Sequence, residues 1–267
     1  MICALCEKEK GRLIDSHFIP SAAYPHVRGQ GEYNGLSPIR VDSFKGTAAH
    51  NDKQVTMELL CRSCEDLFSK NGERIMGCLW ATAEGFPFLE KLRSNGPCVT
   101  ADAYQAYDAS KLETEITQGL TYFAASVFWR AQVWKWGYEG DPYRKSLGDK
   151  YEAVFRKFLL GEGPLDAVRF ILEVNTDEGM TAFMSFPTST RYKGEISHVF
   201  TILGLRFNMY VGGTINNDTL ATFKILNTNM LIYALSFRQS PAYSKLAEQV
   251  QNRVVPKGKL AKHSARG

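Results

Sequence analysis

Two C-x-x-C pairs are the part of this chain whose residue types and spacing most directly indicate chemistry. Cys3 and Cys6 form the first pair, and Cys61 and Cys64 form the second. Each pair makes a tight turn whose two sulfurs can face one ion, and tetrahedral zinc needs two such turns brought together. A single C-x-x-C is also a redox motif, but that motif follows a strand in a βαβ unit, for which Cys3 has no room. The spacing therefore predicts a structural Zn²⁺ site made by all four thiolates.

The elements between and after the two pairs must bring the cysteines together. Residues 12–15 read as a short extended piece that leads into Ser16 and His17, and Pro20 allows a helix to start. Glycine and polar residues dominate residues 28–54, which favours a long loop with room for a small hairpin. The run that begins at Glu65 favours a helix whose acidic start suits the positive end of the helix dipole.

The rest of the chain favours an α+β fold. Apolar residues recur at helical spacing over residues 110–136, where the many aromatic side chains favour a core role over a base-stacking platform. A second helix is predicted over residues 147–160 and a closing helix over 241–254. The β-rich runs, which predict an antiparallel sheet, are residues 168–174, 182–186, 198–203, 205–211 and 222–226. We therefore predict a zinc module at residues 1–95, an α+β domain at 96–255 and a disordered basic tail at 256–267.

Composition limits the classes of protein without selecting one. The chain has 267 residues, 44 % of them hydrophobic, and its 32 Lys and Arg against 28 Asp and Glu permit contact with nucleic acid without requiring it. No signal peptide and no transmembrane segment are predicted, so we expect a cytoplasmic protein, with Cys78 and Cys98 as buried thiols. Phosphate-binding glycine loops, serine-hydrolase elbows and H-E-x-x-H motifs have no counterpart here.

The order of parts in the first quarter of the chain resembles the HNH endonuclease family. Family members carry D-H-I-I-P after the first knuckle, and this chain has Ser16-His17-Phe18-Ile19-Pro20 there. The chain is more similar still to bacterial HNH-like proteins with S-H-I-I-P and C-x-x-C-E motifs. The resemblance implies a treble-clef, ββα-metal module and places His17 as the general base that activates water. It also implies a role in bacterial or phage conflict.

The metal-binding positions of the family are changed in this chain. Ser16 stands where the family has Asp, Thr56 stands where it has Asn, and Glu65 stands where it has the final His. Asp15 is one residue further back and points the other way in an extended segment. A carboxylate suits a hard cation, so His17, Glu65 and Asp15 are the candidate catalytic residues, with Mg²⁺ or Mn²⁺ as the second metal.

Two functions from different classes follow from these residues. In the first, the protein is a divergent metal-dependent nuclease that uses His17 to activate water. In the second, the zinc module is not catalytic and binds nucleic acid or a protein partner; His17 then braces the zinc loop with a hydrogen bond, and Glu65 only interacts with the helix dipole. Convergence of Glu65, Asp15 or His50 on an open point beside His17 would favour the first, and burial of His17 against a carbonyl would contradict it.

Overall fold

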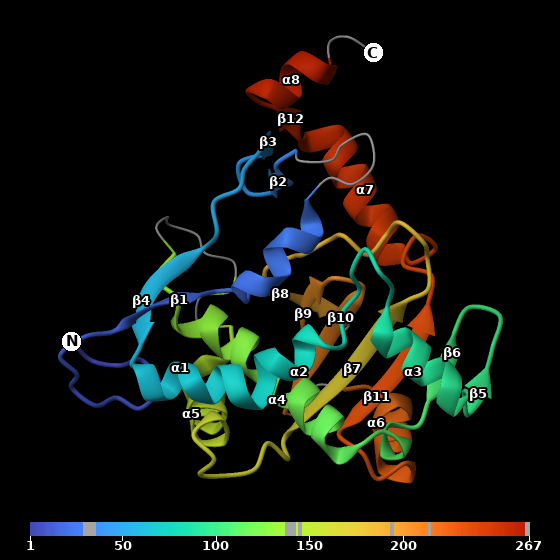
Figure 1. Ribbon diagram of the computed structural model, residues 1–267. Coiled ribbons are helices and arrows are strands. Elements are labelled where there is room, and N and C mark those ends of the chain that lie inside the picture. The colour runs from blue at the N-terminus through green and yellow to red at the C-terminus, as the bar shows by residue number, and fades with distance from the viewer. Residues whose placement is uncertain (29–35, 137–142, 144–145, 193–194, 213–214, 265–267) are drawn as a thin grey trace.

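The computed structural model describes residues 1–28, 36–136, 143, 146–192, 195–212 and 215–264 (Figure 1). Helices and strands pack into one body, and a smaller arm stands out from it at the top of the view. This mixed arrangement confirms the predicted α+β class. Among the helices of these residues, none is long and apolar enough to cross a membrane.

The N-terminal part is a two-stranded antiparallel ribbon followed by a broken helix. Asp15 pairs with Glu58 and His17 pairs with Thr56 across the ribbon. Cys61 is the N-cap of the first helical turn, so the second cysteine pair lies where strand becomes helix. The elements are β1 (Ile14–His17), the 3₁₀ helix η1 (Ser21–Val27), β4 (Thr56–Leu60), α1 (Arg62–Phe68), the π-helical turn η3 (Ser69–Glu73) and α2 (Arg74–Gly77).

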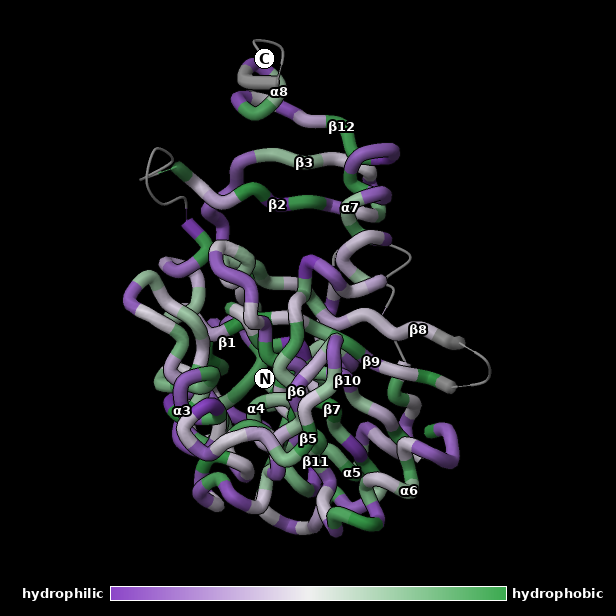
Figure 2. Tube along the Cα trace, turned by 90° about the vertical axis from the view of Figure 1, so that its right-hand side faces the viewer, coloured by the Kyte–Doolittle hydropathy of each residue, from purple (hydrophilic) through white to green (hydrophobic). Residues whose placement is uncertain are grey.

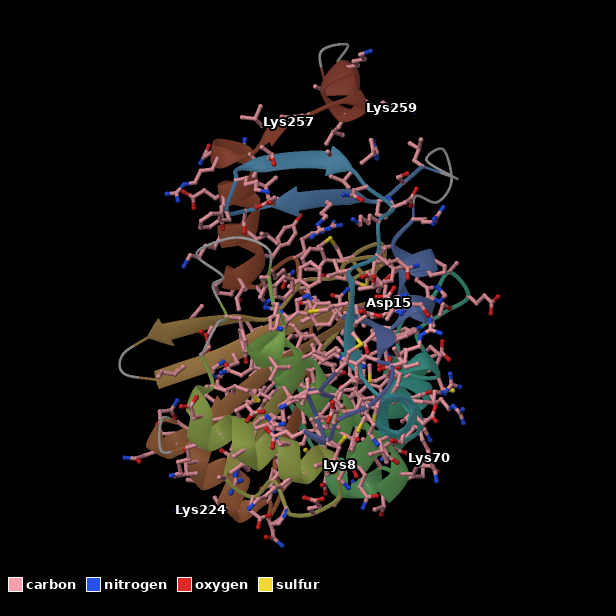
Figure 3. The ribbon with its side chains drawn as sticks, turned by 90° about the vertical axis from the view of Figure 1, so that its left-hand side faces the viewer. Lys8, Asp15, Lys70, Lys224, Lys257 and Lys259 are labelled. Carbon is pink, nitrogen blue, oxygen red and sulfur yellow. The ribbon has the colours of Figure 1, made fainter. Side chains whose placement is uncertain are left out.

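The arm consists of two segments that are far apart in the sequence (Figures 1 and 2). We define it as residues 36–55, which contain a hairpin, and residues 238–264, which contain the last elements of the described chain. Val255 pairs in parallel with Thr47, and α8 packs on β3. The sequence predicts a disordered tail at residues 256–267, whereas Pro256 belongs to β12 and residues 259–264 form α8; residues 265–267 lie outside the described chain. The tail is ordered because β3 offers an edge for β12 to pair with. Lys257 and Lys259 lie at the far end of the arm (Figure 3). Its elements are β2 (Ile39–Asp42), β3 (Thr47–His50), α7 (Pro241–Arg253), β12 (Val255–Pro256) and α8 (Lys259–Ser264).

The main sheet has seven strands in the order β5-β6-β11-β7-β10-β9-β8. The predicted antiparallel sheet is wrong at one pair, since β7 and β11 run parallel. Helix α6 (Asn217–Ile225) causes this, because it carries the chain from β10 past β7 to β11 instead of returning it through a hairpin. The strands are β5 (Val99–Thr100), β6 (Gln105–Tyr107), β7 (Val168–Asn175), β8 (Thr188–Tyr192), β9 (Glu195–Ile202), β10 (Leu205–Val211) and β11 (Met230–Leu235).

Helix α4 (Thr114–Val133) covers one face of this sheet with aromatic side chains. Phe123 and Phe128 pack on Phe200, with ring centroids 6.1 and 5.0 Å apart. Trp129 is completely buried, so the predicted core role of the aromatic helix is confirmed. Phe223 of α6 packs on Leu231 at the opposite face. The other helices are α3 (Pro87–Asn95), the short 3₁₀ helix η4 (Ala109–Lys111) and α5 (Gly148–Leu159).

Some local predictions differ from the structure. The strand predicted at 222–226 is the end of α6, because the Asn216 side chain caps the helix by accepting a hydrogen bond from the Thr219 N–H at 2.8 Å. Of the strand predicted at 182–186, only a single bridge from Met184 to Ile202 forms. Cys78 and Cys98 are exposed instead of buried.

The hydrophobic core is continuous across residue 95, where the sequence suggests a connection between two units. One cluster of buried side chains runs from Cys3 to Ala234. Gly72 lets η3 touch α4, since a Cβ there would lie 3.1 Å from the Phe123 Cα. The N-terminal part that carries the four cysteines is therefore built onto α4 and does not stand apart from it.

Candidate metal centre and the residues around His17

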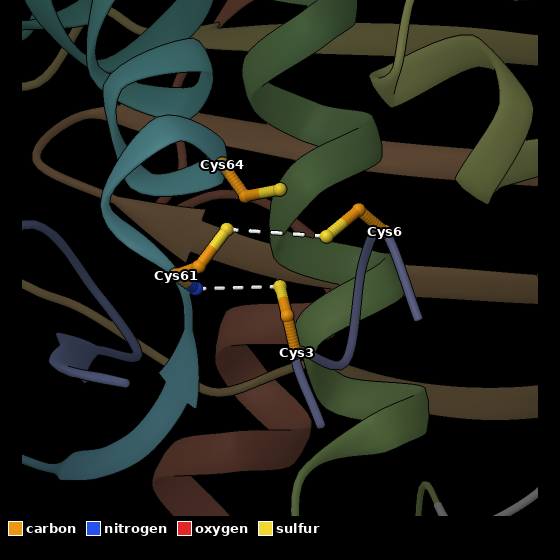
Figure 4. A group of neighbouring side chains, drawn as sticks. All are labelled: Cys3, Cys6, Cys61 and Cys64. Atoms are coloured by element: carbon orange, nitrogen blue, oxygen red, sulfur yellow. Dashed lines mark hydrogen bonds between the residues drawn. The ribbon is translucent and has the colours of Figure 1, made fainter. Parts of the chain in front are cut away.

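The four predicted cysteines converge at the junction of the N-terminal turn and α1 (Figure 4). Their sulfur atoms all lie within 4.8 Å of one another, and the Cys6 and Cys61 sulfurs are 3.9 Å apart. A tetrahedron with Zn–S bonds of about 2.3 Å has edges of about 3.8 Å. Cys3, Cys6, Cys61 and Cys64 therefore have the donor type, the number and the spacing that fit one Zn²⁺.

Local hydrogen bonds favour the thiolate form of Cys61, whereas burial and the neighbouring cysteines raise the pKa of Cys64. The Cys61 N–H donates to the Cys3 sulfur at 3.3 Å, and the Ser63 hydroxyl lies 3.2 Å from the Cys61 sulfur. Burial opposes ionisation of Cys61, but the hydrogen bonds of Ser63 and Cys64 outweigh it and lower its pKa to about 6. Burial raises the pKa of Cys3. Because only thiolates bind zinc, Cys61 is the first of these two ligands to become available as pH rises.

Arg156 of α5 holds the first cysteine turn from the other side. Its guanidinium donates to the carbonyl oxygens of Ala4 at 2.6 Å and Leu5 at 3.1 Å, and it pairs with Glu152 at 2.6 Å. The same Glu152 oxygen accepts from the Trp129 indole N–H at 2.7 Å. Sequence reasoning missed Arg156, because nothing near it in the chain links it to a turn more than a hundred residues earlier.

Ser16 and Glu65 lie in contact beside the metal centre. The Ser16 hydroxyl, which is fully buried, donates to the Glu65 carboxylate at 2.8 Å. Glu65 lies in the first turn of α1, where the helix dipole also favours its negative charge. The two residues come from strand β1 and helix α1, so the pairing of β1 with β4 and the turn at Cys61 bring them together.

His17 lies on the opposite face of the ribbon from Ser16, because successive strand residues point to opposite sides. Its imidazole is half-buried and makes no hydrogen bond or ion pair with any other described residue. Asp15 and Glu58 share this face and stand directly opposite each other on β1 and β4. Sequence reasoning missed Glu58, although the alternating run Thr56-Met57-Glu58 before Cys61 would have placed it on the exposed side of a strand.

The structure does not bring His17, Glu65 and Asp15 together into one metal-sized cluster. Within the described part of the chain, the cysteine cluster is the only group of three or more His, Cys, Asp or Glu side chains spaced to hold an ion. His50 lies in the arm, where its Nδ1 is 2.7 Å from the Ser37 carbonyl oxygen. His17 is nevertheless not bonded to a carbonyl, so its ring stays available to a water or a ligand.

Arg130 of α4 fixes the chain immediately after His17. Its guanidinium is completely buried, pairs with Glu73 at 2.5 Å and donates to the Phe18 carbonyl oxygen at 3.3 Å. It also lies 4.7 Å from the centre of the Phe68 ring. In the sequence, Arg130 is a charged residue among the apolar residues of a predicted helix, and this could have indicated a buried ion pair. Sequence reasoning did not use this signal. Arg130 therefore acts as a positioning residue for the His17 strand.

Replacing Arg130 with methionine should lower the free energy of unfolding by about 3 kcal/mol, because it leaves Glu73 largely buried without its counter-ion. The double variant Arg130→Met/Glu73→Gln should lose less than the sum of the two single variants, since it removes both charges. Urea denaturation of the four proteins provides this comparison. Strictly additive losses would contradict the ion pair as the link between α4 and η3.

Comparisons of this chain with protein-family models, with curated proteins and with solved structures found no match.

Proposed function

We propose that the protein is a divergent HNH-like nuclease that hydrolyses phosphodiester bonds with the help of a divalent cation. The order of parts supports this: a cysteine turn, an antiparallel ribbon with a histidine, and a helix that begins at the second cysteine pair. The resemblance implies a treble-clef module with this order of parts, and in this chain the arm hairpin lies between β1 and β4. Zn²⁺ on the four cysteines would hold this scaffold in place and take no part in the reaction.

The observation that carries the proposal is the contact between Ser16 and Glu65. The resemblance to HNH enzymes puts the two metal ligands at these positions, and here they lie 2.8 Å apart although they are 49 residues apart in sequence. Both now offer oxygen atoms, which suit Mg²⁺ or Mn²⁺. Mg²⁺ commonly binds through one or two protein oxygens plus water and substrate phosphate, so this small donor set is sufficient. When bound, the cation would polarise the scissile phosphate.

The resemblance gives His17 the role of general base, although its ring lies on the opposite face of the ribbon from the Ser16–Glu65 contact. Its ring is partly exposed and free of hydrogen bonds to the described residues, so a nitrogen can take a proton from an attacking water. Arg130, through the Phe18 carbonyl, keeps the strand that carries the ring in place.

Cleavage should need Mg²⁺ or Mn²⁺ in addition to tightly bound zinc. The change Glu65→Gln keeps a hydrogen-bond acceptor for Ser16 but removes the charge that holds the cation. It should raise the Mg²⁺ concentration for half-maximal cleavage by roughly tenfold or more. Glu58→Gln is the matched control, because it makes the same chemical change on the other face of the ribbon. Both should be measured on single- and double-stranded DNA and RNA over a series of metal concentrations.

The possible outcomes of this experiment separate the alternatives. A larger effect of Glu58→Gln would place the cation on the His17 face, with Asp15, instead of at Glu65. If the wild-type protein cleaves none of the nucleic acids with either metal, the catalytic proposal is wrong. The zinc module would then be a non-catalytic one that binds nucleic acid or a protein partner.

A further inference from the structure

A cleft opens between the arm and the body, next to the end of the ribbon that carries His17. The Phe18 N–H donates to the Val55 carbonyl oxygen at 2.9 Å, so the pairing of the two chain segments continues one residue past His17. Ile19 and Val55 then line the cleft. The cleft is open on one side, and its volume is about 100 Å³. This volume is of the order of the space that a single ring occupies in other proteins.

The lining of this cleft combines positive charge with an aromatic wall. Arg40 and Lys53 come from the arm, and Phe186 and Met184 come from the body. The Arg40 guanidinium lies 5.6 Å from the centre of the Phe186 ring. Among the described residues, no acidic side chain lines the cleft.

The cations of the cleft are not neutralised by neighbouring acids. The two aspartates of the hairpin pair elsewhere: Asp42 with Lys45 at 3.6 Å, and Asp52 with Arg28 at 3.1 Å. Arg40 and Lys53 thus make no ion pair with any acid in the described part of the chain. The arm as a whole has nine Lys and Arg against three Asp and Glu, a net charge of +6, whereas the whole chain has only +4. The positive charge of the protein is therefore concentrated on the arm, and the cleft lies at its base.

We propose that the cleft takes one unstacked base of single-stranded nucleic acid, with adjacent phosphates on Arg40 and Lys53. An aromatic wall accepts any base face by stacking, and arginine stacks on bases as well as binding phosphate. A paired base of a duplex cannot enter a space of this size, which is why a single strand is the occupant. The strand would leave the cleft beside His17. This proposal names the substrate of the nuclease proposed above, and it rests on that proposed function for the chemistry at His17. Binding of the strand can be tested separately, because it requires no cleavage.

Binding can be measured by fluorescence anisotropy with the zinc-loaded full chain, without added Mg²⁺, on a labelled oligonucleotide of roughly 12 nucleotides. The double variant Arg40→Gln/Lys53→Gln should bind about tenfold more weakly. The slope of log K against log salt should fall by about 1.4, because two phosphate contacts to a single strand contribute about 0.7 each. The matched double variant Lys257→Gln/Lys259→Gln removes the same charge at the far end of the arm and should cost about twofold at most. Thermal melting checks that all variants fold.

A third variant separates stacking from charge. Phe186→Leu keeps an apolar side chain but removes the ring, so it should weaken binding about fivefold without changing the salt slope. If the two double variants lose equal affinity, the strand is attracted to the whole arm without specificity, and the proposed binding in the cleft is wrong. Tighter binding of a duplex, or competition by a nucleoside monophosphate as strong as by the oligonucleotide, would overturn the single strand as occupant.

The failure of this proposal is distinguishable from the failure of the nuclease proposal. If the cleft variants lose binding as expected but the wild-type protein cleaves nothing, the cleft stands and the nuclease does not. If Arg40→Gln/Lys53→Gln cleaves single strands with unchanged kcat/KM, the nuclease stands and the cleft proposal is wrong.

Discussion

The variant His17→Ala is expected to cleave phosphodiester bonds about 10²- to 10⁴-fold more slowly than the wild-type protein, the range over which a positioned general base contributes. Its zinc content, melting temperature and nucleic-acid affinity should be unchanged. The reason is that the His17 ring makes no hydrogen bond to the described residues, so its loss leaves the β1 backbone and the Arg130 contact to Phe18 intact. Single-turnover cleavage at saturating enzyme measures the chemical step separately from binding.

His26→Ala is the matched control for this result. His26 belongs to the same N-terminal part but lies in η1, with its ring 6.2 Å from that of Trp80. Its replacement should leave the cleavage rate within about twofold. Loss of Lys257 and Lys259 should leave the cleavage rate unchanged and weaken binding by about twofold at most. If those lysine changes abolish cleavage while His17→Ala remains active, the reaction takes place elsewhere and the HNH-like proposal must be abandoned.

Replacing Cys61 with serine is expected to release zinc and to lower the melting temperature of the whole protein by about 10 °C or more. A structural zinc site contributes its binding energy to folding, and each kcal/mol lost shifts the melting temperature of a chain of this size by about 2–4 °C. The whole protein should respond because the cysteine cluster belongs to the same continuous core as α4 and the sheet. Metal analysis and calorimetry on the purified variant measure both quantities.

Cys78→Ser provides the control for the zinc experiment. Cys78 is exposed and lies outside the cluster, so its replacement should change neither zinc content nor melting temperature. Full zinc retention in Cys61→Ser would show that the ligand assignment is wrong. Loss of zinc without loss of stability would show instead that the core, and not the metal, holds the N-terminal part in place.

The sequence allowed prediction of features that depend on short stretches of chain. The two cysteine pairs were predicted because a C-x-x-C turn needs only four residues to specify its geometry. The aromatic helix and strand β10 were predicted because their apolar residues repeat with a clear period. The prediction of a strand at 222–226 was wrong because it relied on β-branched and aromatic residues, which favour strands. In the structure, the cap at Asn216 and the packing of the segment on the sheet favour a helix instead.

Features that depend on distant contacts could not be predicted in this way. The position of Glu58 opposite Asp15 follows from the register of β1 and β4, which are separated by the whole arm hairpin. Arg130 and Arg156 act on residues that are 112 and more than 150 positions away. The contact of Ser16 with Glu65 likewise depends on the pairing of β1 with β4, because the two residues are 49 positions apart in the chain.

The pairing of β12 with β3 fixes the order in which a newly synthesised chain can complete its parts. The four cysteines are all available once residue 64 has left the ribosome, so the metal can bind while most of the chain is still unmade. Strand β3, by contrast, must wait for Val255 and Pro256. Until then its edge is unpaired and open to wrong partners, in the interval when the chain is most prone to aggregation. The basic surface at the arm consequently matures only after residue 255 has been made, and a chain interrupted before that residue would carry all four cysteines but lack the assembled arm.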